Sequence, residues 1–447
     1  MFKSLNKLIF TLDVKLMFSL VKPLKYPAKS TYKISIINII HSISPFNKRD
    51  LIHEFLLIIF MTLVNFLKIL YLPVIILFYF SKYRFIQMNY SQIGTVGDNL
   101  NVMVKRNLLK GYKSIILIPS YYNFNFVKKI FKNLIIIDNT LLNILLLPLK
   151  HSRLISCTGD DTNPTYLNRN LRLVNSSPFA KIHMNYINSL KKKDTLYDFN
   201  NEFDKEMKHH VKKNYSHFKL AKTFVFHHRE NYFAGTSNLR GSELSTYIPS
   251  IKYLLNKGYG VLRISHSKSK KLFFKNKFYR EINTDLAINK KLQYYLIAKC
   301  RGFICNDSGP ASMGPLFSKP VYCTNMHGTI IAAVSKKSLF IIKKIKLKKK
   351  LISYKKAIDL EYFRGPHLCE KYTKKLGFEL VNNNKFEILK GLKEFVNLIK
   401  KKVKQTSRQK KFKESLPDYI EFKHTQSNIA DSFITNNSKF FLNQYKD

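Results

Sequence analysis

Tryptophan is absent from the 447-residue sequence, and cysteine and the acidic residues are scarce. The cysteines are scattered, odd in number and without a Cys-x-x-Cys pair: Cys157, Cys300, Cys305, Cys323 and Cys369. A disulfide framework or a structural zinc site is therefore not expected, and a reducing compartment fits this usage best. We expect each thiol to pack as a small apolar side chain.

Sequence motifs of nucleic-acid recognition are missing as well. The chain has no zinc-finger spacing, no homeodomain-like helix and no RNP-type aromatic motif. Basic residues are nevertheless in large excess, 77 Lys and Arg against 28 Asp and Glu, which gives a formal charge of +49. Such a charge attracts nucleic acid, anionic lipid or phosphorylated small molecules, and a lysine-rich proteome would produce it too. Without a motif, a nucleic-acid partner is not expected.

A long apolar run, Phe55 to Phe80, follows a basic N-terminal stretch. The run is long enough to span a bilayer, but polar residues and a proline interrupt its middle. One spanning helix and two short apolar helices both fit, and attachment to one leaflet suits basic residues on both flanks. We expect residues 1–84 to form a basic and apolar helical segment associated with a membrane. A cleaved signal peptide is not expected, because the run starts far from Met1.

The rest of the chain alternates strand-like and helix-like segments. The first strands are FIQMNYSQ, SIILIPS and LIIID, and a second series begins with KTFVFHH, GVLRIS, GFICN and PVYCT. Helical patterns separate them, for example Glu243 to Asn256, which Gly258 closes, and Asp285 to Cys300. This order predicts an α/β protein with two Rossmann-like domains, each built on a parallel sheet. We expect residues 85–215 and 216–400 to form the two domains and residues 401–447 a basic tail with a terminal helix.

Three further segments are basic, and two of them have two interpretations each. The stretch from Ser265 to Asp285 is either a loop that closes over a phosphorylated substrate or a solvated loop. The run KKIKLKKK, Lys343 to Lys350, alternates with apolar residues as a solvated strand edge does. The tail from Lys400 to Lys413 is typical of a lipid contact or of disorder.

Polar loops follow three strands of the second series: HHREN, RISH and NDSGP. Because parallel strands joined by right-handed crossovers end at one edge, these loops should lie together. Arginine forks and the amides at a helix start are the usual means of holding a diphosphate. The expected contacts of such a ligand are Arg229, Arg263, Asp307, Ser308, Gly309 and, from the IGTVGDN turn, Gly94. Two simpler interpretations remain open: an ion pair of Arg229 with Glu230 or Glu243, and an ordinary helix N-cap at Ser308.

Taken in order, several stretches resemble a family of bacterial GT-B-type glycosyltransferases linked to surface-polysaccharide synthesis. They include SQIGTVGDN, KTFVFHHRENYF, LIAKCRGFICNDSGPASMGPLFSKPVYCTN and IADSFITNNSKFFL, and extend from about Tyr90 to Leu442. The resemblance implies two Rossmann-like domains facing a cleft. It implies an acceptor on the side of 85–215 and a nucleotide-sugar donor on the side of 216–400.

Two motifs of this chain are also similar to those of other glycosyltransferases. The HHRE strand end resembles the His-x-Arg loop of fucosyltransferase-like enzymes, in which the arginine meets the donor phosphate, and Arg229 stands at that position. The DSGP loop resembles its counterpart in heptose-type transferases, which carry a histidine a few residues later. Here Ala311 and Ser312 stand instead, and this departure leaves the donor nucleotide open.

The transfer reaction needs a base that accepts the acceptor proton. Asp98 in GTVGDN is the carboxylate of the first-domain loop, although an aspartate there is also a common helix cap. His227, with its neighbour His228, is the second choice, and core packing or a hydrogen bond to a neighbouring loop is the alternative for at least one of them. No tightly bound cofactor and no metal are expected, because Asp160 and Asp161 are adjacent rather than spaced as Asp-x-Asp, and arginines and amides can neutralise a leaving diphosphate.

The sequence therefore predicts a membrane-associated enzyme that transfers a sugar from a nucleotide-sugar to a glycan or lipid-linked acceptor. The expected location is the cytoplasmic face of a bacterial inner membrane, in contact with its anionic surface. The alternatives are a nucleotide-sugar epimerase or pyruvyl-type transferase on the same scaffold, and a nonenzymatic basic scaffold for membrane or nucleic acid. The sugar, the base of the nucleotide, the acceptor, the stereochemical course and the oligomeric state are not encoded in any of these motifs.

Overall fold

The structure is a computed structural model. It describes residues 80–87, 96–118, 127–139, 155–157, 197–230, 238–327, 334–360, 362–364, 377–401, 404–417 and 420–441, with seven single positions between 73 and 185. These residues belong to two compact units. Unit 1 comprises Met1–Ser91, Val102–Lys128 and Leu134–Leu173, and unit 2 comprises Gln92–Asn101, Lys129–Asn133 and Val174–Asp447.

The division into units differs from the expected ranges, and Gln92–Asn101 and Lys129–Asn133, expected in the first domain, belong to unit 2. Helix α11 (Asn201–Asn214) belongs to unit 2, although residues up to 215 were expected in the first domain. Residues 401–447, expected as a separate tail, also belong to unit 2. The buried side of α11 explains its place, because Phe203 packs against Tyr295 of unit 2 and Lys299 pairs with Asp204.

Unit 1 contains a four-stranded parallel sheet in the order β3-β2-β1-β4. Its strands are β1 (Tyr83–Gln87), β2 (Lys113–Ile118), β3 (Ile135–Asp138) and β4 (Ile155–Cys157). Helix α6 (Asn101–Leu109) connects β1 to β2, and α7 (Val127–Ile130) lies between β2 and β3 in the sequence. The βαβαβ prediction for this part of the chain is confirmed, and β4 is an addition that it did not include.

Unit 2 is built on a seven-stranded sheet whose neighbouring strands are all parallel. The strands are β5 (Thr223–His227), β6 (Gly260–Ser265), β7 (Tyr279–Asn283), β8 (Gly302–Asn306), β9 (Val321–Met326), β10 (Leu339–Ile342) and β14 (Asn428–Ile429). Their order is β14-β10-β9-β8-β5-β6-β7. Without β14 this is the 3-2-1-4-5-6 order of dinucleotide-binding folds. The order reverses between β5 and β8, which is where such sheets bind ligands.

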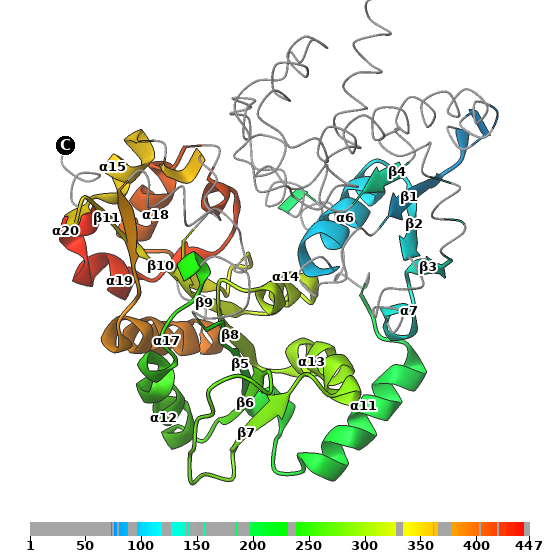
Figure 1. Ribbon diagram of the computed structural model, residues 1–447, viewed down its shortest axis with the longest axis horizontal. Helices are drawn as coiled ribbons and strands as arrows, with labels where there is room; N and C mark the ends of the chain where they lie inside the picture. Colours follow the sequence, from blue (N-terminus) through cyan, green and yellow to red (C-terminus); the bar gives the residue numbers. More distant parts are fainter. Residues whose placement is uncertain are drawn as a thin grey trace, which may run out of the picture. The chain divides into compact units, whose positions relative to one another are not determined.

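Helices cover both faces of this sheet, and Figure 1 shows α12 and α17 on one side and α11 and α13 on the other. The remaining bounds are α12 (Ile248–Asn256), α13 (Ala287–Lys299) and α17 (Lys385–Lys400). Asn384 caps α17 in a capping box with Glu387, which satisfies backbone donors at its start. The helix expected from Glu243 begins as a 3₁₀ turn, η5 (Leu244–Tyr247), which continues into α12. Helix α12 ends just before Gly258, whose φ is +75°.

Two of the basic segments are ordered parts of unit 2. The Ser265–Asp285 stretch, expected as one long loop, contains the edge strand β7. The KKIKLKKK run forms a hairpin of β11 (Lys344–Leu347) and β12 (Lys350–Ile352), which pairs with β13 (Phe378–Val381) in a three-stranded antiparallel sheet. The expected strand is confirmed, but its first lysine, Lys343, is buried rather than solvated.

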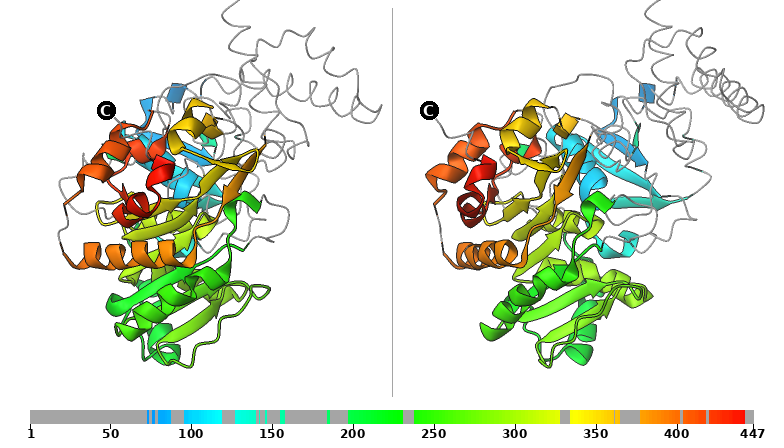
Figure 2. Two further views of the ribbon diagram at one scale, coloured as in Figure 1. Left: turned by 90° about the vertical axis from the view of Figure 1, so that its left-hand side faces the viewer. Right: turned by 60° about the vertical axis from the view of Figure 1, so that its left-hand side comes forward.

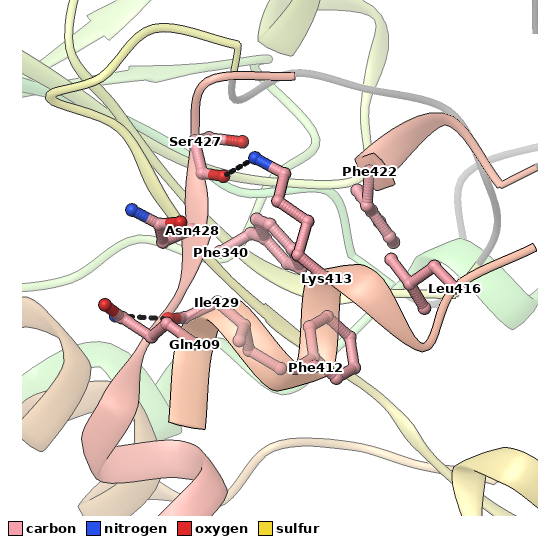
Figure 3. Close-up of a pocket in the computed structure, with 9 residues that line it drawn as sticks. All are labelled: Phe340, Gln409, Phe412, Lys413, Leu416, Phe422, Ser427, Asn428 and Ile429. Carbon is pink, nitrogen blue, oxygen red and sulfur yellow. Dashed lines mark hydrogen bonds between the residues drawn. The ribbon is translucent and has the colours of Figure 1, made fainter. Parts of the chain in front are cut away.

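The C-terminal residues of unit 2 pack against the β14 side of the sheet (Figure 2). Besides β14 they form α18 (Ser407–Glu414), α19 (Asp431–Asn436) and α20 (Ser438–Phe441), so the basic tail is helical from Ser407 onward. Figure 3 shows Lys413 among Phe340, Phe412 and Phe422, with its amine directed at the carbonyl of Ser427, 2.9 Å away. These side chains leave no room for a water molecule, so this is a packed corner and not a ligand site.

The N-terminal apolar segment lies almost entirely outside the described residues. Four of its positions are placed in helical conformation, among them Leu77 and Phe80, whose side chains are exposed. Within the described part of the chain, none of the helices combines the length and the apolar character needed to cross a membrane. The membrane association of residues 1–84 stays a prediction.

Candidate functional site

Asn306, the last residue of β8, fixes the loop that follows β5. Its Oδ1 accepts a hydrogen bond from the Arg229 backbone N–H at 2.8 Å, and its Nδ2 donates to the Arg229 carbonyl at 2.9 Å. Nδ2 also approaches Ser242 Oγ at 3.2 Å. The Asn306 side chain is completely buried. This clamp holds the backbone of Arg229 at the point where the strand order reverses.

A buried polar network continues from this clamp. The Tyr247 hydroxyl lies 3.4 Å from Ser242 Oγ and 2.5 Å from Thr324 Oγ1, and it accepts from Asn325 Nδ2 at 3.1 Å. Burial raises the pKa of Tyr247 to about 12, so the phenol remains protonated. Because each hydroxyl and amide has partners, the network stiffens the ends of β8 and β9.

Asp307 follows Asn306 and has a buried carboxylate at this edge. Its Oδ1 accepts a hydrogen bond from Arg240 Nε at 3.2 Å and lies 3.1 Å from Arg240 Nη2 in an ion pair, and its Oδ2 lies 2.6 Å from His327 Nδ1. Burial alone would raise the pKa of Asp307, but the charges of Arg240, His327 and Arg229 and the hydrogen bond from His327 lower it below its ordinary value. Asp307 is therefore an ionised acceptor, and its partner His327 Nδ1 carries the hydrogen.

Lys343, immediately after β10, holds the turn that carries Arg240. Its amine donates to the carbonyls of Leu239 and Gly241 at 2.7 and 2.6 Å, one on each side of Arg240. These carbonyls belong to or follow the 3₁₀ turn η4 (Asn238–Arg240). Burial lowers the pKa of Lys343 to about 8, and the charge of Asp307 opposes that shift.

Arg229 completes the cluster, which we call the arginine site: Arg229, Arg240, Asp307, His327 and Lys343. Burial and then the charge of Arg240 lower the pKa of Arg229 to about 10, while Asp307 raises it, so the guanidinium stays charged at neutral pH. Three basic side chains thus surround one carboxylate in this part of the sheet edge. Such an arrangement attracts an anion, and arginines bind phosphate groups through paired donors.

Arg263, expected beside the diphosphate, lies in a different surrounding. It is fully buried in β6, where Nη1 donates to Glu281 at 2.5 Å and to the Lys270 carbonyl at 2.6 Å. Glu230 Oε1 lies 3.5 Å from its Nη2 and accepts the Lys270 N–H at 2.9 Å. The described partners of Arg263 are thus carboxylates and a carbonyl of unit 2, which suits a structural ion pair between β6, β7 and the β5 loop.

The two histidines at the end of β5 are buried and uncharged. His227 Nδ1 donates to the Ile264 carbonyl at 3.2 Å, and His228 Nε2 lies 3.0 Å from Ser242 Oγ. Burial, followed by neighbouring positive groups, lowers the pKa of each to about 3. A group with this pKa is a weak proton acceptor at neutral pH, so this surrounding fits core packing better than base catalysis.

The NDSGP loop continues into a 3₁₀ turn, η6 (Gly309–Ser312), and a short helix, α14 (Met313–Leu316). Ser308 precedes the turn and donates from Oγ to the Asn306 carbonyl at 3.2 Å instead of capping it. A π-helical turn, η1 (Val96–Leu100), packs on this loop, and a Cβ at Gly97 would lie 2.1 Å from Ser312 Oγ. Asp98 is in η1, but its side chain and Gly94 are outside the described residues.

Arg240, His327 and Lys343 were missed by the sequence predictions. The DSGP loop has no histidine of its own. His327, which directly follows β9, places an imidazole beside Asp307 instead. Its position after PVYCTNM, a strand of the same sheet, was a usable signal. No comparable signal in the sequence marks Arg240 or Lys343, because an arginine in a turn and a lysine in a basic run ordinarily lie at the surface.

The cysteines and metal ligands of the described residues add no further site. Cys300, Cys305 and Cys323 are buried free thiols, and the expected apolar packing is confirmed for these three. The described parts of the two units contain no cluster of histidine, cysteine and carboxylate side chains suited to a metal ion. Asp160 and Asp161 lie outside those parts.

Neither a protein-family model nor a curated protein matches this sequence. Among solved structures, a glycosyl transferase family 9 protein of Veillonella parvula matches with 12% identity over 72% of this chain and 98% of its own, at a TM-score of 0.40. The E. coli heptosyltransferase WaaC with ADP matches with 9% identity over 65% and 97%, at 0.34. E. coli ADP-heptose LPS heptosyltransferase II matches with 12% identity over 60% and 92%, at 0.35. At these identities and TM-scores, no functional conclusion follows.

Proposed function

We propose that this protein is a glycosyltransferase that takes a sugar from a nucleotide-sugar donor and binds the donor diphosphate at the arginine site. The observation that carries the proposal is the meeting of Arg229 and Arg240 at Asp307, where the strand order of the unit 2 sheet reverses. Ligands of doubly wound sheets bind at that reversal. The resemblance of HHRE and NDSGP to glycosyltransferase motifs points to the same chemistry.

In the proposed reaction, the negative charge that develops on the leaving diphosphate must be stabilised, and arginines can do this without a metal ion. The acceptor hydroxyl oxygen forms a bond to the anomeric carbon, the bond from that carbon to the phosphate oxygen breaks, and its electron pair leaves with the diphosphate. Arg229 and Arg240 would stabilise that charge, because preorganised cations favour the state in which it develops. The acceptor proton goes to a base, for which Asp98 remains the candidate given the low pKa of His227.

Donor binding is tested by the thermal stability of the full-length protein with UDP, GDP, CDP and ADP. Binding to the native state stabilises it by about 2.7 kcal/mol when the ligand is at 100 times its Kd. We expect one nucleotide to raise the melting temperature. Arg229→Ala and Arg240→Ala should each weaken its affinity about 10- to 100-fold, since a charged hydrogen bond contributes about 1.5–3 kcal/mol.

The matched control is Arg280→Ala, which removes an exposed arginine from β7 of the same sheet. It should leave the affinity within about twofold, since exposed charges contribute little. Failure of every nucleotide to bind, or an equal loss in all three variants, would refute the donor site.

Catalysis is tested by incubating the protein with the matching nucleotide-sugars and a membrane extract as the source of acceptors. Release of the nucleoside diphosphate together with a labelled glycan or glycolipid supports transfer. An epimerised nucleotide-sugar, or a pyruvylated sugar formed with phosphoenolpyruvate, would instead identify the alternative reactions. Binding of duplex DNA with steep salt dependence and no nucleotide affinity would favour a nonenzymatic scaffold.

The cellular setting is a further part of the proposal. We propose that the enzyme works in surface-polysaccharide synthesis on the cytoplasmic face of the inner membrane, motivated by the apolar run from Phe55 to Phe80 and the basic excess of the chain. Cell fractionation should place the full-length chain in the membrane pellet. A variant without residues 1–84 should move to the supernatant, and recovery of the full-length chain there would contradict this setting.

A further inference from the structure

The loop between β6 and β7 presents an aromatic ring to solvent. Phe273 is 89% exposed, more than any other large apolar residue in the described part of the chain. A single exposed apolar side chain is ordinary, so the exposure alone indicates no function. What distinguishes Phe273 is the loop around it, which is both fixed in place and strongly basic.

Two carboxylates fix the backbone just before Phe273. Glu230, which is buried, accepts the Lys270 N–H at 2.9 Å. Glu281, on the edge strand β7, accepts the Leu272 N–H at the same distance. Hydrogen bonds to ionised acceptors are stronger than those between neutral groups, so this part of the loop is firmly attached to the sheet.

The residues just after Phe273 are held as well. The ring of Phe274 packs edge-on against Tyr279, with the ring centroids 4.7 Å apart. The Phe274 carbonyl accepts the Asn276 N–H at 2.8 Å. Because the chain is held on both sides, Phe273 cannot turn inward without breaking these contacts. Its exposed position is therefore built into the folded loop.

The same loop is basic throughout. It has no acidic residue from position 267 to 280. Its exposed cations are Lys268, Lys270, Lys271, Lys275, Lys277 and Arg280. The carboxylates that follow are already paired, Glu281 with Arg263 and Asp285 with His266. An apolar ring among lysines is typical of segments that lie on an anionic membrane.

We propose that residues 267–280 contact an anionic lipid bilayer, with the Phe273 ring at the boundary of headgroups and acyl chains and the lysines at the lipid phosphates. Strands β5 and β6 are parallel, so this loop leaves the sheet at the same edge as the arginine site. Contact there brings the bilayer to the side on which a lipid-linked acceptor is needed. The inference adds a contact to the proposed membrane setting and requires neither residues 1–84 nor the donor site.

The exposure of the ring favours lipid over single-stranded nucleic acid. Sites for single strands also combine cations with aromatic rings, but they are grooves in which successive bases stack. A ring that is 89% exposed has no groove wall beside it. A bilayer needs none, because the ring enters it from above the surface.

This contact is expected to be weak and reversible. One ring and a few lysines do not anchor a protein, because stable attachment takes two signals. The loop therefore orients a chain that residues 1–84 hold at the membrane. A variant without those residues is released when a cell lysate is diluted, in agreement with the fractionation result expected above.

The absence of tryptophan makes a direct test possible, because Phe273→Trp introduces the sole indole of the full-length protein. The exposed position should accept this substitution without a change of fold. Its fluorescence is recorded with vesicles of phosphatidylcholine alone and of phosphatidylcholine mixed with anionic phosphatidylglycerol. We expect the emission to shift to shorter wavelength with the anionic vesicles only. Lipids brominated on their acyl chains should quench it.

The matched reporter control is Phe386→Trp. Phe386, at the start of α17, is 64% exposed and also lies beside a lysine, Lys385. The emission of this variant should stay at the wavelength of a water-exposed indole with both kinds of vesicle. An equal shift in the two reporters would show general adsorption of a basic protein and would overturn the role of the loop.

The charge dependence is tested in the Phe273→Trp background. Lys271→Gln combined with Lys275→Gln should remove most of the shift, because each lysine near an anionic surface contributes about fivefold to binding and the pair about 25-fold. Lys208→Gln combined with Lys212→Gln removes the same charge from exposed positions of α11 and should leave the shift intact. An equal loss in both double variants would contradict a specific loop contact.

The remaining outcomes separate this inference from the proposed setting. An unchanged emission of Phe273→Trp with anionic vesicles overturns the loop contact. If that protein nevertheless sediments with the vesicles, the membrane setting stands on other residues. A shift with single-stranded oligothymidylate and none with vesicles would assign the loop to nucleic acid and likewise overturn the inference.

Discussion

Replacing Asn306 by alanine should destabilise unit 2 and weaken nucleotide binding together. The side chain makes three hydrogen bonds, at 2.8 and 2.9 Å to the backbone of Arg229 and at 3.2 Å to Ser242 Oγ. Alanine leaves the N–H of Arg229 without this partner, whereas the Arg229 carbonyl keeps the hydrogen bond that it accepts from the Ser242 N–H at 3.3 Å. A buried polar group that loses its partner costs about 1–3 kcal/mol and a lost ordinary hydrogen bond about 1 kcal/mol, so the N–H and the carbonyl together predict a loss of roughly 2–4 kcal/mol.

The assay is urea unfolding followed by far-UV circular dichroism, because the chain has no tryptophan to report by fluorescence. The same samples are titrated with the nucleoside diphosphate that binds the wild type. We expect its affinity to fall about tenfold in Asn306→Ala, since a freed loop no longer presents Arg229 and every 1.4 kcal/mol of lost binding energy is a factor of ten.

A second buried asparagine provides the control. Asn289 is also buried in unit 2, but its recorded bond is a single donation to the Asn283 carbonyl at 2.7 Å. Asn289→Ala should cost about 1 kcal/mol and leave nucleotide affinity unchanged. If Asn306→Ala were no more destabilising than this control and bound nucleotide normally, the clamp would not position Arg229 and the account of the site would be refuted.

Three other predictions concern buried groups of unit 2. His227 and His228 have pKa values of about 3 in the folded protein, whereas histidines of the unfolded chain take up protons below about pH 6.5. The contribution of each neutral histidine to the free energy of unfolding should therefore be full above pH 6.5 and be lost as the pH falls toward 3. In urea unfolding we expect a loss of about 2 kcal/mol per histidine at pH 5. Gly391→Ala in α17 should cost about 1–3 kcal/mol in the same assay, because the new Cβ would lie 2.3 Å from the Tyr322 hydroxyl. Lys343→Met should lower nucleotide affinity about tenfold in calorimetry, because the carbonyls on both sides of the Arg240 turn lose a charged donor.

Matched variants test the histidine and the lysine predictions further. His228→Gln should lose about 2 kcal/mol less than the wild type between pH 7.5 and 5, and an unchanged pH dependence would show that His228 is not held neutral. Lys346→Met changes a partly exposed lysine of the same basic run and should leave nucleotide affinity within about twofold. An equal loss in both lysine variants would mean that general charge, not the clamp on the turn, sets the affinity.

Several features of the fold were predictable because local chemistry determines them. The apolar runs predicted β1, β2 and β3 of unit 1 and β5, β6, β8 and β9 of unit 2. Gly258 predicted the end of α12, because its φ of +75° suits glycine. The strand β7 was missed because the Tyr279–Asn283 stretch is polar and adjoins a lysine-rich segment. It lies at the sheet edge, where such residues are tolerated.

The sequence by itself determined the alternation of strands and helices, and with it the edge of the sheet at which the loops after β5 and β8 had to meet. Only the tertiary structure decided which side chains gather there. Asp307 meets Arg240, 67 residues away, and His327, 20 residues away, because β8 lies between β5 and β9. Lys343 reaches across more than 100 residues to hold the Arg240 turn. Such pairings follow from strand order and burial. They place Lys343, a residue type that ordinarily lies at the surface, in a buried position where its amine holds the Arg240 turn.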